Sequence, residues 1–182
     1  MIMPPFGTPQ LNLLEKLCNL IAVSGDEGEV RKIVLEEIKD YADDVRVDAL
    51  GNVLATRRGR GAKRVRVMLD AHMDEVGLMI VADDGEGLFR FETVGGIDPR
   101  HLLGKQFFVG KDRTPAVIGG KPIHLLESGE RTRKVAVDAL RLDLGPAGKA
   151  KVGDRAGFAT AFRRVGPSIM AKSIDTASAS PP

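Results

Sequence analysis

The sequence is poor in aromatic residues and in cysteine. Among 182 residues there is no tryptophan and a single tyrosine. Surfaces that bind single-stranded nucleic acid stack bases on aromatic side chains, so this composition argues against such a partner. The only cysteine, Cys18, excludes a framework of internal disulfides and is typical of the reducing cytoplasm. We therefore expect a cytoplasmic protein that binds no nucleic acid.

Long hydrophobic runs and an excess of one charge are missing as well. No apolar stretch approaches the roughly 20 residues that cross a membrane. Residues 1–5 lack the basic and apolar regions of a secretory signal. The 27 basic and 25 acidic residues leave a formal charge of +2, which is too small to attract a polyanion. A hydrophobic content of 43% predicts an ordinary globular protein without a membrane partner.

The first part of the chain shows the hydrophobic period of helices. Leucines recur at helical spacing over about residues 9–22, and Cys18 lies within this predicted helix as a core thiol. A second apolar face predicts a helix over about residues 27–42. Ser24 or Asp26 is expected to cap its N-terminus, because these side chains accept hydrogen bonds from the first helical N–H groups.

The period then changes to that of short strands separated by glycine-rich turns. A basic, glycine-rich stretch at 57–64 is expected to be a solvated hairpin tip, although a phosphate-binding patch is an alternative. From about residue 77 to 165 the pattern predicts a small barrel or sandwich. Strands are predicted at 45–47, 52–56, 65–69, 76–81, 89–94, 106–109, 116–118, 134–140 and 158–162.

The strongest chemical signal is the pair His72 and Asp74. Residues two apart on a strand share a face, so one side chain could ligate a metal while the other holds that ligand in place. This arrangement favours a metallohydrolase. On spacing alone, the alternative is a structural histidine at a strand end that is hydrogen-bonded to a carboxylate.

Several further segments, in order, resemble one known family over nearly the full length. The chain resembles the TET-type metallo-aminopeptidases, which include glutamyl and deblocking aminopeptidases and some members labelled endoglucanase. Each motif is weak alone, but their shared order and spacing make the resemblance specific. The segments are Ser24-Gly25, 48–52, 71–77, 95–99, 117–124, 152–154 and 170–175.

The resemblance implies an α/β fold in which a partial aminopeptidase-type catalytic domain is interrupted by an inserted β domain. Residues 1–76 and 166–175 would belong to the catalytic domain, and 77–165 to a small barrel or sandwich that supports dimerisation. Residues 176–182 are expected to be a disordered tail. Family members use two divalent metals, usually zinc or cobalt, to remove N-terminal residues from peptides, and they commonly form dodecamers. A peptide substrate and a homo-oligomer are therefore the expected partners.

Three site residues follow from the matching positions. His72 would ligate one metal, Asp74 would orient that histidine and assist catalysis, and Asp175 would bridge both metals. The family's general-base glutamate and remaining ligands lie beyond Asp175, where this sequence has seven more residues, none of them Glu, Asp or His. We therefore expect a metallo-aminopeptidase chain that is inactive by itself. The alternative is a non-catalytic oligomerisation or interaction module derived from that family.

Other polar residues match no catalytic position in the family. His101 and His124 are expected to be structural or surface residues, and Asp98 and Asp154 are expected to form turns. Glu75 would face away from Asp74 if the strand continued, so we do not expect it to act as a base.

Overall fold

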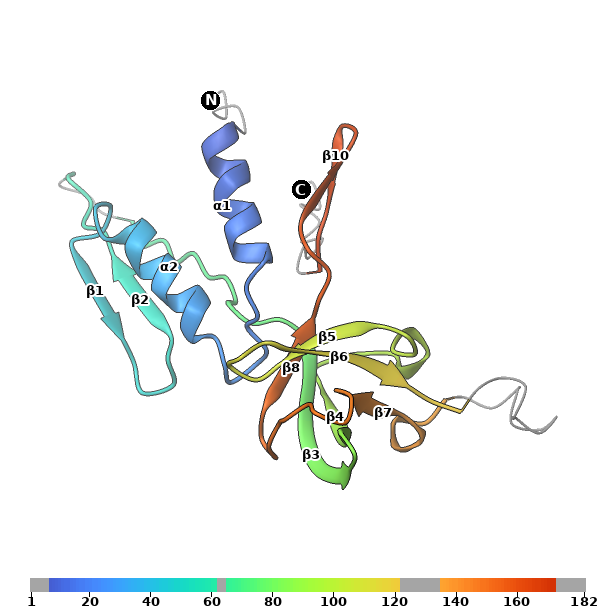
Figure 1. The fold of residues 1–182 in the computed structure, drawn as a ribbon. Coiled ribbons are helices and arrows are strands. Elements are labelled where there is room, and N and C mark those ends of the chain that lie inside the picture. The colour runs from blue at the N-terminus through green and yellow to red at the C-terminus, as the bar shows by residue number, and fades with distance from the viewer. Residues whose placement is uncertain (1–6, 62–64, 122–134, 173–182) are drawn as a thin grey trace.

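The computed structural model describes residues 7–61, 65–121 and 135–172, and it shows a mixed α/β fold (Figure 1). No helix in these three ranges has both the length and the apolar character needed to cross a membrane. The helices are α1 (Thr8–Cys18), α2 (Gly28–Ile38), and the short 3-10 helices η1 (Pro99–His101) and η3 (Val137–Ala139). The strands are β1 (Asp44–Val47), β2 (Val53–Thr56), β3 (Gly77–Gly85), β4 (Leu88–Val94), β5 (Gln106–Val109), β6 (Thr114–Gly119), β7 (Arg141–Asp143), β8 (Arg155–Phe158), β9 (Arg163–Val165) and β10 (Ser168–Met170).

Helix α2 lies against the antiparallel hairpin of β1 and β2 (Figure 1). The hairpin turn is fixed by Asp48, whose Oδ1 accepts hydrogen bonds of 2.9 Å from the N–H groups of Leu50 and Asn52. Bonds from Asn52 hold the pKa of the Asp48 carboxyl below its ordinary value. Arg31 of α2 donates from Nε to the Gly51 carbonyl at 2.7 Å, which ties the helix to the turn. The two strands and the turn predicted here are confirmed.

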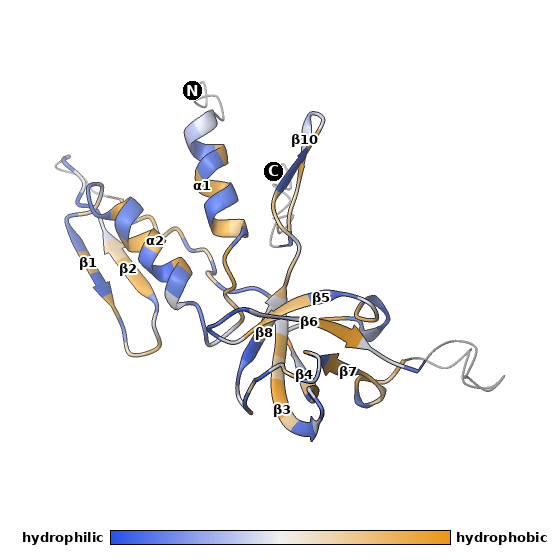
Figure 2. Ribbon diagram, in the orientation of Figure 1, coloured by the Kyte–Doolittle hydropathy of each residue, from blue (hydrophilic) through white to orange (hydrophobic). Residues whose placement is uncertain are grey.

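Six antiparallel strands close into a barrel in the order β3-β4-β7-β6-β5-β8. Side chains at alternate positions of a strand point to the same side, which fills the interior with pairs such as Leu78 and Ile80, or Phe89 and Phe91. Phe107 is fully buried and packs against Phe158, with ring centroids 4.4 Å apart. Figure 2 shows the apolar residues concentrated along these strands. Of the two predicted β architectures, the structure therefore has the barrel.

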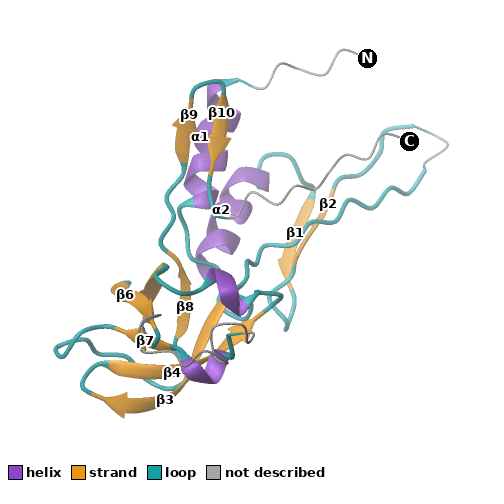
Figure 3. Cartoon of the chain, turned by 90° about the vertical axis from the view of Figure 1, so that its right-hand side faces the viewer, coloured by secondary structure: helices purple, strands orange, loops and turns teal. Residues whose placement is uncertain are grey.

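A second small hairpin, β9–β10, follows the barrel. It projects from the same side of the barrel as α1 (Figures 1 and 3). Each of its strands has three residues, and most of them are exposed. Such a short two-stranded ribbon is marginally stable alone, so its position must depend on contacts at its ends.

Several predicted elements are wrong. Residues 65–69 form no strand, and the apolar side chains of Val67 and Leu69 are 77% and 93% exposed. Because residues 65–69 form no strand, the described part of the 57–64 stretch (57–61) does not form the tip of a hairpin. A strand was predicted across 134–140, where Val137–Ala139 instead forms η3, and the strand predicted at 158–162 ends at Phe158. The two helices are shorter than predicted, ending at Cys18 and Ile38.

Candidate functional site

His72 and Asp74 lie just before β3, where the chain passes close to the loop that follows α1. A parallel bridge joins Val23 to Glu75, and the Glu75 N–H donates to the Ala22 carbonyl at 2.8 Å. The segment 71–76 is thus held by a bridge rather than by a full strand. It stays next to the N-terminal helices and leads directly into the barrel (Figure 1).

The His72 and Asp74 side chains are brought together as the sequence predicts. Nδ1 of His72 lies 2.9 Å from the Asp74 backbone carbonyl and 3.3 Å from Asp74 Oδ1. Hydrogen bonding at one ring nitrogen fixes the orientation and tautomer of an imidazole, which is how metal-ligating histidines are commonly held. The His72 side chain is 65% exposed and that of Asp74 is 38% exposed. Solvent and small ligands therefore reach the pair.

Ser24 is a member of this site that sequence reasoning placed elsewhere. Helix α2 begins at Gly28 after Glu27 and has no side-chain cap, so the expectation that Ser24 or Asp26 caps it is wrong. Ser24 Oγ instead donates a hydrogen bond to Asp74 Oδ2, across 50 positions of the sequence. This bond is the main reason that the pKa of Asp74 lies below its ordinary value, which keeps the carboxylate ionised.

A pocket of about 280 Å³ adjoins the pair. Its walls come from α1, the loop after it, Val30 of α2 and the 72–75 segment. The buried thiol of Cys18 lies on this wall, and its pKa is raised by burial first and by the nearby Glu75 carboxylate second. The lining residues are Leu14, Leu17, Cys18, Leu20, Ala22, Val30, His72, Met73, Asp74 and Glu75. The site is therefore a mostly apolar hollow with polar groups at one edge.

The donor types suit zinc or cobalt, because imidazole and carboxylate are preferred ligands of both. Within the described ranges, however, no group of three or more His, Cys, Asp or Glu side chains could hold a metal ion. Asp175, the predicted bridging ligand, lies outside the described residues. The described part of the chain thus contributes one candidate ligand, His72, and the carboxylate that orients it, Asp74, but no complete metal centre.

A second polar pair beside the site was not predicted. Lys172 Nζ contacts Glu75 Oε1 at 2.5 Å, and the same Oε1 accepts a 3.2 Å hydrogen bond from the Ala22 N–H. No pattern in the sequence connects positions 75 and 172. Lys172 does belong to the 170–175 segment that carries the family resemblance, which is the one signal that could have drawn attention to it.

The remaining polar candidates have structural roles where they are described. Asp98 caps η1 by accepting from the Arg100 N–H at 3.0 Å, and Asp154 accepts from the Lys151 N–H in a turn at 3.0 Å. Both are turn residues, as predicted. His101 lies in η1, on the barrel side of the molecule, and His124 lies outside the described residues.

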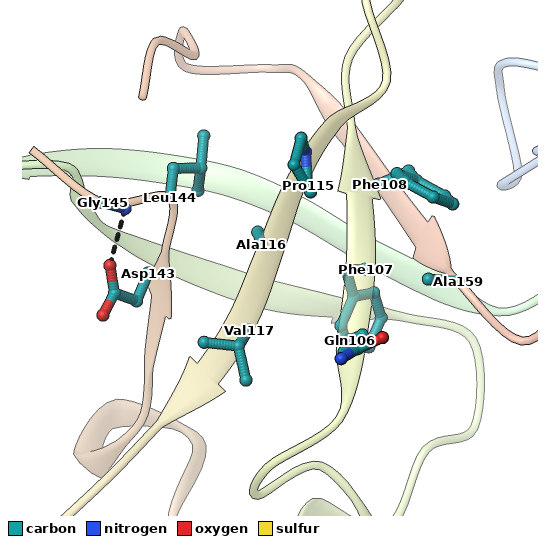
Figure 4. Close-up of a pocket in the computed structure, with 10 residues that line it drawn as sticks. All are labelled: Gln106, Phe107, Phe108, Pro115, Ala116, Val117, Asp143, Leu144, Gly145 and Ala159. Carbon is teal, nitrogen blue, oxygen red and sulfur yellow. Dashed lines mark hydrogen bonds between the residues drawn. The ribbon is translucent and has the colours of Figure 1, made fainter. Parts of the chain in front are cut away.

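A second hollow lies elsewhere, on the surface of the barrel (Figure 4). It has a volume of about 510 Å³ and runs over β5, β6 and the end of β7. Apolar side chains such as Phe108, Pro115 and Leu144 line it, and Asp143 accepts from the Gly145 N–H at 2.7 Å on its margin. It has no histidine or paired carboxylates, so it lacks the chemistry of the hollow beside His72.

Comparison with known proteins defines the class. The model of the M42 glutamyl aminopeptidase family matches residues 51–178. The lysyl aminopeptidase of Pyrococcus furiosus is 34% identical over 164 residues, which cover 84% of this chain and 46% of that protein. The chain belongs to the M42 family of aminopeptidases, so the predicted resemblance to TET-type enzymes is confirmed.

Solved structures agree with this assignment. The TET aminopeptidase of a marine-sediment thaumarchaeote superposes with a TM-score of 0.78 at 31% identity, covering 86% of this chain and 46% of that one. The TET1 peptidase of Pyrococcus horikoshii, which can assemble into a tetrahedron or a large octahedral shell, gives 0.69 at 35% identity, covering 84% and 47%. The chain spans about half the length of the curated relatives it matches.

Proposed function

We propose that this chain carries part of the active site of a two-metal aminopeptidase, which removes N-terminal residues from peptides. The observation that supports this most directly is the hydrogen-bonded group of Ser24, Asp74 and His72 at the edge of an accessible hollow. Membership of a family of hydrolases supplies the reaction class. The proposal also covers the arrangement of domains, with the barrel as an insertion between 1–76 and 166–175.

Each residue has a distinct role in this proposal. His72 would bind one metal, and Asp175 would bridge two metals. Asp74 holds the imidazole in one orientation, and Ser24 keeps the Asp74 carboxylate ionised and in place. Two bound divalent ions would activate a water molecule and stabilise the charge that develops on the peptide carbonyl. Zinc and cobalt are the ions that this donor set favours.

The 182 residues do not contain the general base or all the ligands that the resemblance implies. Zinc takes about four ligands in protein sites, and His72 with Asp175 supplies two. We therefore propose that these residues hydrolyse no peptide by themselves and that the missing groups must come from additional polypeptide.

A calorimetric titration with Co²⁺ or Zn²⁺ tests the site without requiring turnover. The proposal predicts that His72→Ala weakens binding by about 100-fold or more, because loss of outer-shell partners alone costs about 10–100-fold. His101→Ala is the matched control, since it removes a histidine in η1 that has no proposed role. An unchanged affinity in His72→Ala would reject His72 as a metal ligand.

The second candidate is a non-catalytic module that pairs with copies of itself through the barrel. The apolar hollow over β5 and β6 favours it, because it presents Val117 at 39% exposure beside Phe108 and Pro115. The oligomeric shells of the P. horikoshii relative add support for a homo-oligomer. Sedimentation of the chain and of Val117→Lys distinguishes the cases: self-association that the lysine abolishes supports pairing here, and a strict monomer at high concentration opposes it.

A further inference from the structure

A buried ion pair joins two segments that are 97 positions apart in the sequence. The side chains of Lys172 and Glu75 are 4% and 9% exposed, and Nζ lies 2.5 Å from Oε1. The chain's exposed pairs are different: Lys16 and Glu36, for example, are 52% and 69% exposed and 3.6 Å apart. A pair of the exposed kind contributes little to stability, whereas removing one partner of a buried pair is strongly destabilising because it leaves the other charge buried and uncompensated.

Glu75 is fixed from three sides. Its N–H donates to the Ala22 carbonyl, and its Oε1 accepts from the Ala22 N–H. On the barrel side, Gly157 of β8 lies close by: a Cβ added there would be 3.4 Å from Glu75 Oε1 and 2.7 Å from a methyl group of Ile21. Glu75 is thus held beside Ala22, and the Lys172 ammonium pairs with it there.

Lys172 follows the hairpin β9–β10 directly, and that hairpin has little packing of its own. Most of its side chains are exposed, and two strands of three residues are marginal alone. A buried ion pair at the end of β10 is the kind of contact that would hold such a ribbon in a single register. Without its partner, either charge would remain buried at a large cost.

In the sequence, the two residues of the pair stand next to or near the proposed site residues. Asp74 directly precedes Glu75, and Asp175 follows Lys172 by three positions. The ion pair therefore ties the segment that carries His72 and Asp74 to the end of the β9–β10 hairpin.

We propose that Glu75 and Lys172 are positioning residues: their ion pair docks the end of the β9–β10 hairpin onto the His72–Asp74 segment and so holds that segment in place. The docking part stands on the described contacts, and the metal part rests on the proposed function. Neither side chain is expected to ligate metal or to transfer a proton.

Hydrogen exchange of the metal-free chain tests the docking. We compare Glu75→Gln, which keeps an acceptor for the Ala22 N–H, Lys172→Met, which keeps the aliphatic stem, and the double variant. Each single change is expected to accelerate exchange of the amides in 163–170 at least tenfold, while barrel amides such as Ile80 and Phe107 keep their protection. The double variant should lose less than the two single effects combined, because it leaves no unpaired buried charge.

The exposed pair supplies the matched control, Lys16→Met, which should leave the hairpin exchange unchanged. The docking is refuted if the single variants leave the exchange of 163–170 within twofold of the original chain. It is equally refuted if Lys16→Met accelerates these amides as much, or if the barrel amides lose protection to the same extent, since the pair would then be a general stability element.

A Co²⁺ titration of the same variants tests the metal part. Glu75→Gln and Lys172→Met should each weaken binding about tenfold or more, while Lys16→Met should leave it unchanged. Faster hairpin exchange with unaltered Co²⁺ affinity would overturn the positioning of the metal ligands. If the original chain binds no Co²⁺, the metal part fails for these residues alone, and hydrogen exchange still decides whether the pair docks the hairpin.

Discussion

Replacing Ser24 by alanine tests whether the group around Asp74 is organised as the structure describes. The change removes the hydroxyl that donates to Asp74 Oδ2 and leaves the backbone unaltered. A hydrogen bond to a charged group is worth about 1.5–3 kcal/mol, and because the Asp74 side chain is 38% exposed, water recovers part of this. We expect a loss of about 1 kcal/mol in the free energy of unfolding near neutral pH. In a chain of this size that lowers Tm by about 2–4 °C.

The loss should depend on pH in a definite direction. The Ser24 bond holds the pKa of Asp74 below its ordinary value, so the carboxylate binds protons less readily in the folded chain than in the unfolded one. The stabilisation is then present above the unfolded pKa, near 3.9, and is lost as the pH falls through the folded pKa. The stability gap between the original chain and Ser24→Ala should therefore be widest near pH 7 and narrow toward pH 3.

Urea unfolding followed by circular dichroism over this pH range measures the gap. Ser168→Ala, which changes an exposed serine of β10, is the matched control and should cost little at any pH. A gap that stays constant between pH 7 and pH 3 would show that the hydroxyl acts by packing and not through the ionised carboxylate. Equal losses in Ser24→Ala and Ser168→Ala would refute the reasoning altogether.

Two further predictions concern the barrel and the buried thiol. Gly87→Ala should be more destabilising than Gly85→Ala by about 2 kcal/mol or more in urea unfolding. Both positions have a positive φ, but only a Cβ at 87 would meet a backbone atom, the Gly145 carbonyl oxygen at 1.8 Å. Similar losses in the two variants would contradict the described turn. Cys18 should react with a thiol reagent at pH 8 about 100-fold more slowly in the folded chain than in urea. The reason is that Cys18 is 2% exposed and that its thiol pKa is raised by burial and by Glu75. Rapid labelling without denaturant would contradict its place in the core.

The sequence predicted the local elements where local preferences and tertiary contacts agree. The strands that form the barrel are short, mostly apolar segments between glycine-rich turns, and the sequence predicted strands that overlap β3, β4, β5 and β6. The 65–69 stretch shows the limit of this reasoning. Its β-branched residues favour a strand, but a strand needs hydrogen-bonding neighbours, and in the described ranges this stretch has none.

The family also followed from the sequence, because an ordered set of motifs is a linear property of the chain. The sequence singled out His72 and Asp74 through their spacing on an expected strand, whereas the structure brings the two side chains together outside a strand. What only the tertiary structure decided is which distant groups support that pair. Ser24 was expected to cap a helix and instead binds Asp74, and Glu75 was set aside as a candidate base and instead holds Lys172. These contacts join residues 50 and 97 positions apart, and they exist because the loop after α1, the start of β3 and the end of β10 converge on one point. No hydrophobic period or local motif encodes such a convergence, since it arises from the packing of whole elements.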